Sequence, residues 1–151
     1  ATEYGLSYRA SEVAALGELA KERGLAFHMD GARLANAAAH LNVPLRAFTR
    51  DAGVDILSFG GTKNGLLFGE VVVALNPSAA QGLVYLRKMN MQLASKMRFM
   101  SAQFIAILEG DLWLRSASHA NAMAARLRAG RARCSPPLPR SAHSPRCDPP
   151  S

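Results

Sequence analysis

Apolar and polar positions alternate between helical and strand-like patterns in the first part of the chain. Residues 11–24 carry apolar side chains at helical spacing, and Ser11 is expected to cap that helix. Residues 25–29 form a short apolar run that ends at Asp30, which predicts a buried strand. Residues 32–41 are rich in alanine and predict a second helix.

Two further apolar runs predict strands, at residues 54–59 and 71–75, and residues 79–128 follow a helical pattern with breaks expected near Gly110 and Ser116. A strand, a helix and a second strand within about 30 residues are typical of a βαβ unit. The chain is therefore expected to fold as an α/β domain with a mostly parallel sheet and flanking helices.

The composition changes after Ala129. Residues 130–151 contain six of the eight prolines, both cysteines and a single leucine. Such a segment buries too little apolar surface to offset the entropy lost on ordering. We expect a domain over residues 1–129 and a disordered Arg/Pro-rich tail over residues 130–151. The bias of the tail resembles a GC-rich gene translated out of frame, which is a hypothesis about its origin.

The net charge of +7 is unevenly distributed. Residues 126–151 hold six arginines and one aspartate (+5), which leaves +2 for residues 1–125. The tail has no aromatic residue for stacking on bases, so no nucleic-acid partner is expected. No apolar run approaches the ~20 residues that span a bilayer, and no membrane contact is expected. The cysteine-free body is compatible with the cytoplasm, and no metal-ligand spacing occurs.

Two charged residues stand where apolar runs give way to glycine. Asp30 precedes Gly31, and Lys63 follows Gly60 and Gly61. Ligand sites in open parallel sheets gather at the carboxyl ends of strands. Taken singly, Asp30 equally suits an N-cap for residues 32–41, Lys63 a solvated loop lysine, and the glycines a tight turn.

Together these residues suit pyridoxal phosphate (PLP), which needs a lysine for an imine bond and an acid facing its pyridinium nitrogen. The lysine is expected in a partly buried site, and the glycines are expected to let the backbone approach the cofactor. Thr62 and Ser58 are candidate hydroxyl donors to its phosphate. A P-loop is excluded because Asn64 follows Lys63, and no Rossmann glycine pattern follows a strand.

Two motifs, HMDGARL (residues 28–34) and SFGGTKNG (residues 58–65), carry a family resemblance, and residues 2–5, 92–99 and 119–124 add to it. From Thr2 to about Leu127 the chain resembles low-specificity L-threonine aldolase, a fold-type-I PLP enzyme of the aspartate aminotransferase superfamily. The resemblance implies part of the large domain, a cytoplasmic enzyme and a homo-oligomer (dimer or tetramer).

By the same resemblance, Lys63 would bind PLP covalently and Asp30 would pair with the pyridinium nitrogen. Arg33 would lie near the phenolic oxygen and hold the substrate carboxylate. The reaction would be retro-aldol cleavage of L-threonine or L-allo-threonine to glycine and acetaldehyde. The family's phosphate-binding loop and small domain are expected to lie outside this chain.

Two alternatives stay open. The chain is an inactive truncated or frame-shifted product, or it derives from another fold-type-I PLP enzyme such as a racemase, aminotransferase or β-lyase, since all of these use the same acid and lysine. Two further interpretations concern packing. His28 is expected to be a core histidine with a satisfied hydrogen bond. The methionines of the helical stretch are expected to be packing residues: Met89, Met91, Met97 and Met100.

Overall fold

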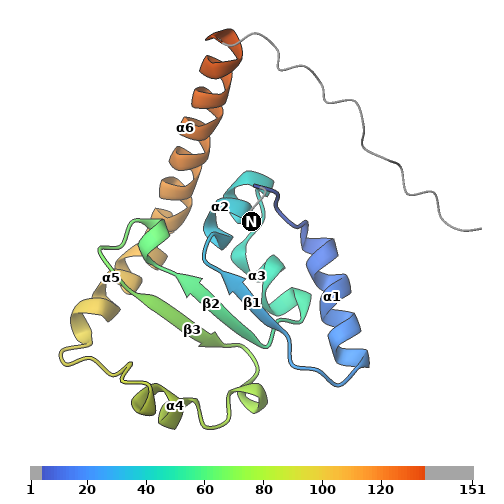
Figure 1. The fold of residues 1–151 in the computed structure, drawn as a ribbon, viewed down its shortest axis with the longest axis vertical. Coiled ribbons are helices and arrows are strands. Elements are labelled where there is room, and N and C mark those ends of the chain that lie inside the picture. Colours follow the sequence, from blue (N-terminus) through green and yellow to red (C-terminus); the bar gives the residue numbers. More distant parts are fainter. Residues whose placement is uncertain (1–4, 135–151) are drawn as a thin grey trace, which may run out of the picture.

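The computed structural model describes residues 5–134, which form a small sheet and a set of helices (Figure 1). In chain order the elements are α1 (Ala10–Glu22), β1 (His28–Gly31), α2 (Leu34–Leu41), α3 (Leu45–Phe48), the 3₁₀ helix η1 (Arg50–Ala52), β2 (Ile56–Gly60), η2 (Thr62–Asn64), β3 (Glu70–Ala74), η3 (Pro77–Ala80), α4 (Leu83–Met89), α5 (Arg98–Leu108), η4 (Glu109–Asp111) and α6 (Leu112–Cys134). The three strands expected from the apolar runs are confirmed, with bounds shifted by one to three residues.

The sheet has the order β1-β2-β3 and is mixed. Strand β1 pairs with β2 in parallel, whereas β2 pairs with β3 antiparallel. The expected α/β fold with flanking helices is confirmed, and the sheet of the described residues is mixed, with one parallel and one antiparallel pairing. The reason is the length of the connections. A parallel crossover needs about a dozen residues or more, which the segment carrying α2, α3 and η1 supplies, but residues 61–69 are too few.

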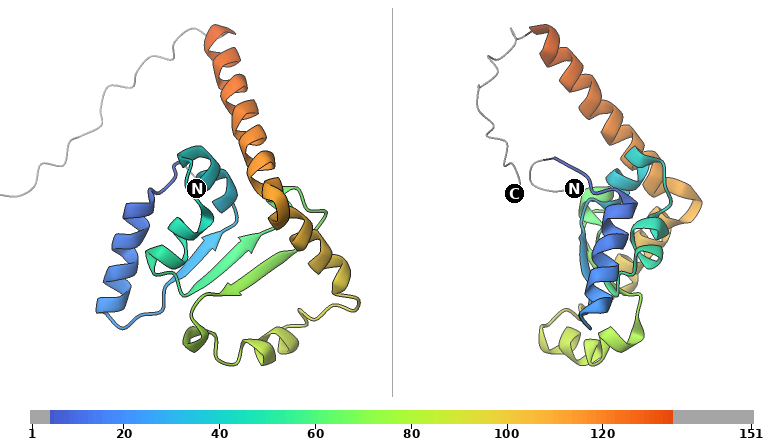
Figure 2. Two further views of the ribbon diagram at one scale, coloured as in Figure 1. Left: turned by 180° about the vertical axis from the view of Figure 1, so that it is seen from behind. Right: turned by 90° about the vertical axis from the view of Figure 1, so that its right-hand side faces the viewer.

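One face of the sheet is covered by helices. The right-hand view of Figure 2 shows α1, α2 and α3 on the same side of the strands. Cross-strand rows of side chains face these helices: Met29 with Leu57 and Val73, and Gly31 with Phe59 and Val71. The buried core under this face comprises Val13, Leu34, Ala38, Phe48, Ala52, Val54, Leu57 and Phe59.

The opposite face is open. Its rows place Asp30 beside Ser58 and Val72, and His28 beside Ile56. Asp30 and His28 are exposed, and Val72 is 50% exposed. Because strand side chains alternate between the two faces, the polar members of the HMDG motif fall on the uncovered side.

Helix α1 approaches the rest of the domain closely at Gly17. A Cβ placed on Gly17 would lie 2.1 Å from the carbonyl oxygen of Ala52 in η1. The expected cap by Ser11 is wrong. The helix begins at Ala10, and the Glu12 carboxylate accepts a hydrogen bond from the Arg9 backbone N–H (2.6 Å), which satisfies a free donor at the helix start.

The C-terminal helical region has a break that its pattern does not indicate, at residues 90–97 between α4 and α5. The break near Gly110 is confirmed, since this residue has φ +56 between α5 and α6. The break near Ser116 is wrong, because α6 is continuous through it. Helix α6 also runs on to Cys134, past the boundary expected after Ala129. Residues 135–151, the rest of the expected disordered tail, lie outside the described residues.

Asparagine side chains join α2 to α6. Asn121 Nδ2 donates to the Asn36 carbonyl (2.9 Å), and Asn36 Nδ2 donates to Asn121 Oδ1 (3.2 Å). The pair is partly buried and reciprocal, so it fixes the two helices in register.

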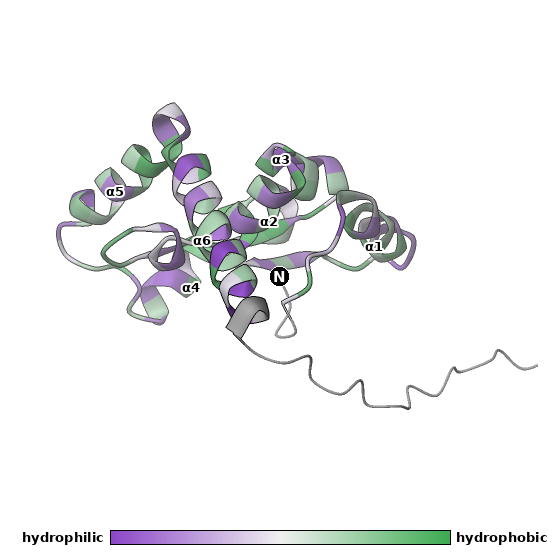
Figure 3. Ribbon diagram, turned by 90° about the horizontal axis from the view of Figure 1, so that it is seen from above, coloured by the Kyte–Doolittle hydropathy of each residue, from purple (hydrophilic) through white to green (hydrophobic). Residues whose placement is uncertain are grey.

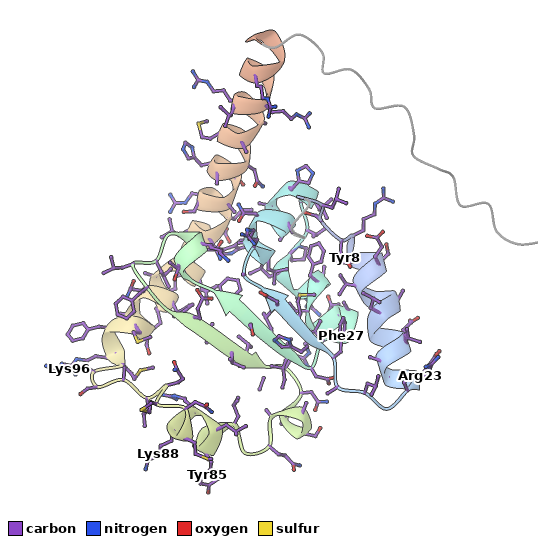
Figure 4. All side chains as sticks on the ribbon, viewed as in Figure 1. Tyr8, Arg23, Phe27, Tyr85, Lys88 and Lys96 are labelled. Atoms are coloured by element: carbon purple, nitrogen blue, oxygen red, sulfur yellow. The ribbon has the colours of Figure 1, made fainter. Side chains whose placement is uncertain are left out.

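Apolar side chains are exposed on α4 and just after it. Val84 is 79% exposed, Tyr85 75%, Met89 76% and Met91 88%. The expectation that Met89 and Met91 are packing residues is therefore wrong. Figure 4 shows the labelled Tyr85 and Lys88 pointing away from the sheet, and Figure 3 shows α1 and α5 beyond opposite edges of the sheet. No helix formed by residues 5–134 combines the length and apolar character needed to cross a bilayer.

Candidate active site

Asp30 stands near the carboxyl end of β1, on the open face. Its Oδ1 accepts a hydrogen bond from the backbone N–H of Ala32 (3.0 Å), which closes the turn into α2. The N-cap position of α2 is occupied by Arg33, so Asp30 shapes the turn before the helix and does not cap it. Asp30 Oδ2 makes no hydrogen bond within residues 5–134 and points to the side of the sheet that no helix covers.

Ser58 is the direct neighbour of Asp30 on β2. It is half-buried, and its hydroxyl lies 2.9 Å from His28 Nε2. His28 is exposed, so the interpretation of a core histidine is wrong, although its ring does have a hydrogen-bond partner. A cavity of about 220 Å³ between α1 and β1 borders both His28 and Asp30. Figure 4 marks Tyr8 and Phe27, which also line it.

Lys63 lies in η2, just beyond the end of β2. Lys63 and the preceding Thr62 are exposed, whereas Asn64 is only 5% exposed. The expectation of a partly buried lysine is therefore wrong for the described chain. The side chain of Lys63 makes no hydrogen bond or ion pair within residues 5–134, so its amine is accessible.

The glycines before Lys63 are needed for packing inside the protein. A Cβ on Gly61 would lie 2.6 Å from the Gly69 carbonyl oxygen. A Cβ on Gly60 would lie 3.0 Å from both the Cα and the carbonyl oxygen of Ala32. The two glycines therefore let backbone segments touch, and the expectation that they also let the backbone approach a cofactor stays a prediction.

The contact between Gly60 and Ala32 brings the two candidate loops together. Asp30 lies in β1 just before the strand ends, Arg33 lies in the turn after β1, and Lys63 lies in the turn after β2. Because β1 and β2 are parallel neighbours, both loops leave the sheet at the same edge. Arg33 is exposed at the start of α2, and its side chain makes no hydrogen bond within the described residues. The arrangement gathers an acid, an amine, a guanidinium and two hydroxyls at one end of the sheet.

Asp55 forms the main polar contact at the other end of the strands. It accepts hydrogen bonds from the Phe27 N–H (2.8 Å) and from Asn76 Nδ2 (2.6 Å). These donors hold the pKa of Asp55 below its ordinary value, with the Phe27 N–H as the larger cause. The carboxylate therefore ties the start of β1 to the start of β2 and the end of β3, away from the candidate site.

The predictions from the sequence did not include the hydrogen bonds by which Asn64 and Asp55 stabilise the fold. For Asn64 a signal existed, because an amide between Lys63 and Gly65 in a glycine-rich turn often bonds to a main-chain group. For Asp55 the pattern gave none, since its partners at positions 27 and 76 are distant in sequence. Lys96 and Arg98 lie outside the site loops, before and at the start of α5, where the Arg98 guanidinium stacks 4.8 Å from the ring centre of Phe99.

Comparisons with known proteins match this chain to one enzyme family and to one fold. The family model described as beta-eliminating lyase matches residues 1–146. Two curated relatives, both named low specificity L-threonine aldolase, come from Pseudomonas sp. (strain NCIMB 10558) and Pseudomonas aeruginosa. They are 49% and 48% identical over 121 residues, which is 80% of this chain and 35% of each relative.

A solved structure of Leishmania major threonine aldolase superposes with a TM-score of 0.80 at 32% identity, over 88% of this chain and 39% of that one. The chain thus spans about a third of the length of the curated relatives it matches. Beta-eliminating lyases and threonine aldolases are pyridoxal phosphate-dependent enzymes, and the resemblance predicted from the two motifs is confirmed. On these matches, the chain belongs to the beta-eliminating lyase family.

Proposed function

We propose that this chain carries the central PLP-binding part of a threonine aldolase, which cleaves L-threonine or L-allo-threonine to glycine and acetaldehyde. The observation that carries the proposal is the contact between the loops that follow β1 and β2, made where Gly60 meets Ala32. Together with the parallel pairing of β1 and β2, that contact sets Asp30 and Lys63 at one edge of the sheet, whose open face is covered by no helix of residues 5–134.

The residues present fit the cofactor. The Asp30 carboxylate would face the pyridinium nitrogen and keep that nitrogen protonated. Its Oδ1 already accepts a hydrogen bond from the Ala32 N–H. Ser58 and Thr62 would donate hydroxyl hydrogen bonds to the phosphate. When bound, PLP supplies an electron sink for the pair left on the substrate α-carbon.

Lys63 and Arg33 would bind the reacting partners. Lys63 presents an exposed amine through which the cofactor can attach covalently. Arg33 presents a guanidinium at the start of α2, where a planar fork and the positive end of the helix both favour a substrate carboxylate. The guanidinium would suit the carboxylate of an amino acid, and the name of the threonine aldolase relatives supports a small amino acid with a hydroxyl on its β-carbon.

Homo-oligomer formation is part of the proposal. The exposed apolar side chains of α4 and of Met91 support it, because such a surface is ordinarily buried against another chain. Another fold-type-I reaction on an amino acid is the second candidate, favoured by the fact that Asp30 and Lys63 serve all of them. A cytoplasmic location remains the prediction from the cysteine-free body.

Reductive trapping tests the cofactor part of the proposal. The chain has only four lysines, Lys21, Lys63, Lys88 and Lys96, so the other three are internal controls. The protein is incubated with PLP, reduced with borohydride and mapped by peptide mass spectrometry. The proposal expects the pyridoxyl label to concentrate on Lys63, and expects Asp30→Asn to weaken that preference. Equal labelling of the four lysines would contradict it.

A second assay separates the aldolase from its alternatives. Incubation with PLP and L-threonine is followed by quantification of glycine and acetaldehyde. Formation of both products that Lys63→Ala abolishes supports aldolase activity of the chain. Selective labelling of Lys63 without product would instead support the inactive-product alternative, and racemised threonine would support another reaction on the same site.

A further inference from the structure

The turn that carries Lys63 is closed by hydrogen bonds within it. The Gly61 carbonyl accepts from the N–H groups of Asn64 (2.9 Å) and Leu66 (3.2 Å). The Gly61 N–H in turn donates to the Gly69 carbonyl (3.1 Å), which joins the turn to the start of β3. Residues 61–66 therefore form a compact loop with little freedom at either end.

Asn64 fills the inside of this loop. Its side-chain Nδ2 donates to the Gly60 carbonyl (2.5 Å), the last carbonyl of β2, and its side chain is 95% buried. Gly65, directly after it, has φ +99, a left-handed conformation that a glycine adopts without strain. The amide thus bridges from the turn back to the strand end at the point where the chain direction changes.

Residues 61–66 differ in their burial. Gly61, Asn64 and Leu66 are buried, whereas Thr62 and Lys63 are exposed. The buried amide of Asn64, bonded to the end of β2, fills the inside of the turn. The side chains of Thr62 and Lys63 therefore point to solvent. Lys63 thus lies on the exposed side of a turn whose inside is occupied by the anchored Asn64 amide.

We propose that Asn64 is a positioning residue for Lys63: its Nδ2 bond to the Gly60 carbonyl fixes the 3₁₀ turn so that the lysine amine is presented at the edge shared with Asp30. This inference rests on the function proposed above. Behind the turn lies a cavity of about 190 Å³, bordered by Asn64, Gln103 and Ser116. Loss of the anchor therefore gives the turn room to collapse inward and carry Lys63 away from its place.

The test uses the lysine labelling described above on the full chain. Asn64→Asp keeps the shape of the side chain but sets an oxygen, in place of the donor, against the Gly60 carbonyl. Asn64→Ala removes the donor without adding charge. Asn121→Asp is the matched control, because Asn121 also donates to a main-chain carbonyl, that of Asn36, in a partly buried position.

We expect both Asn64 variants to lower the ratio of label on Lys63 to the mean label on the other three lysines. The expected fall is roughly tenfold, the change that corresponds to about 1.4 kcal/mol, within the range of one buried hydrogen bond. The pH at which Lys63 is half-labelled should also move. The control should keep the wild-type ratio and pH profile at a temperature where circular dichroism shows every variant to be folded.

Each outcome decides the inference. Folded Asn64 variants with the wild-type ratio would overturn it while leaving the proposed function intact. An equal loss of selectivity in Asn121→Asp would also overturn it, since any weakening of the fold would then suffice. Unfolding of both Asn64 variants would show that Asn64 is needed for folding and not specifically for the position of Lys63, which would also overturn the inference. A wild-type chain without selectivity for Lys63 would reject the proposed function together with the inference.

Discussion

Replacement of Gly17 by alanine sets two effects of opposite sign against each other. In the interior of a helix, glycine is about 1 kcal/mol less favourable than alanine, so propensity alone predicts that Gly17→Ala stabilises α1. The added Cβ would, however, lie 2.1 Å from the Ala52 carbonyl oxygen, whereas ordinary contact begins at 3.4 Å. Both groups are fixed parts of backbones, so α1 would have to retreat by about 1.3 Å (3.4 minus 2.1).

The retreat would loosen the packing of Val13, which is 3% exposed and lies one turn before Gly17 in the core. Overpacking of this kind costs typically about 1–3 kcal/mol, and more where the backbone cannot yield. We therefore expect Gly17→Ala to lower the free energy of unfolding by about 2 kcal/mol after the propensity gain is subtracted. The steric effect should dominate.

Urea denaturation followed by circular dichroism measures this difference. Gly130→Ala is the matched control, because Gly130 is also helical and has no atom within 4 Å of an added Cβ. That variant should gain up to about 1 kcal/mol or leave stability unchanged. A Gly17→Ala protein as stable as the wild type would refute the argument, since it would show that α1 does not pack against Ala52 at this distance.

The remaining predictions concern carboxylates. Asp55→Asn should lower the free energy of unfolding by about 1.5–3 kcal/mol at pH 7, measured by urea denaturation, because both partners, the Phe27 N–H and Asn76 Nδ2, are donors and an amide can accept from only one. Because the folded state lowers the pKa of Asp55, its contribution is fully present above the unfolded value of about 3.9 and is lost as the pH falls through the folded value. The stability difference between wild type and Asp55→Asn should therefore be constant from pH 7 to 5 and shrink below about pH 4; a difference that persisted at pH 2 would contradict this. Asp51→Asn breaks the exposed pair with Arg46 (2.9 Å) and should leave the urea midpoint almost unchanged, because solvent screens both groups; a clear fall of the midpoint in the same assay would show the pair to be more than a surface contact.

The positions of the strands could be predicted because their apolar runs are short and bounded by glycine, asparagine or proline. The βαβ pattern predicts parallel pairing but says nothing of the direction of β3. That direction follows from the connection, since the nine residues between β2 and β3 are too few for a parallel crossover. The start of β1 moved from position 25 to His28 because the tie between Phe27 and Asp55, invisible to local patterning, sets where pairing begins.

The sequence predicts which residue types lie at the strand ends of the candidate site. It does not predict how exposed these residues are or which segments pack against them. The two motifs place Asp30 and Lys63 at strand ends, and parallel pairing of β1 and β2 brings those ends to one edge of the sheet, whereas the roles of the two residues stay predictions. The exposure of Lys63 and His28 could not be predicted, since it depends on which face of the sheet the helices cover. The packing role of Gly60 and Gly61 likewise depends on segments, at Ala32 and Gly69, that only the fold brings close.

Because helices cover only one face of the sheet, successive positions along a strand should differ in the substitutions that they tolerate. A mutational library selected only for stable folding should reject polar residues at Met29, Leu57 and Phe59 and accept them at their neighbours. The same library selected for retention of the cofactor should show the reverse alternation on β1 and β2, with intolerance at Asp30 and Ser58. The positions intolerant in one selection should then alternate along β1 and β2 with those intolerant in the other. This alternation would separate the residues needed for folding from those needed to hold the cofactor.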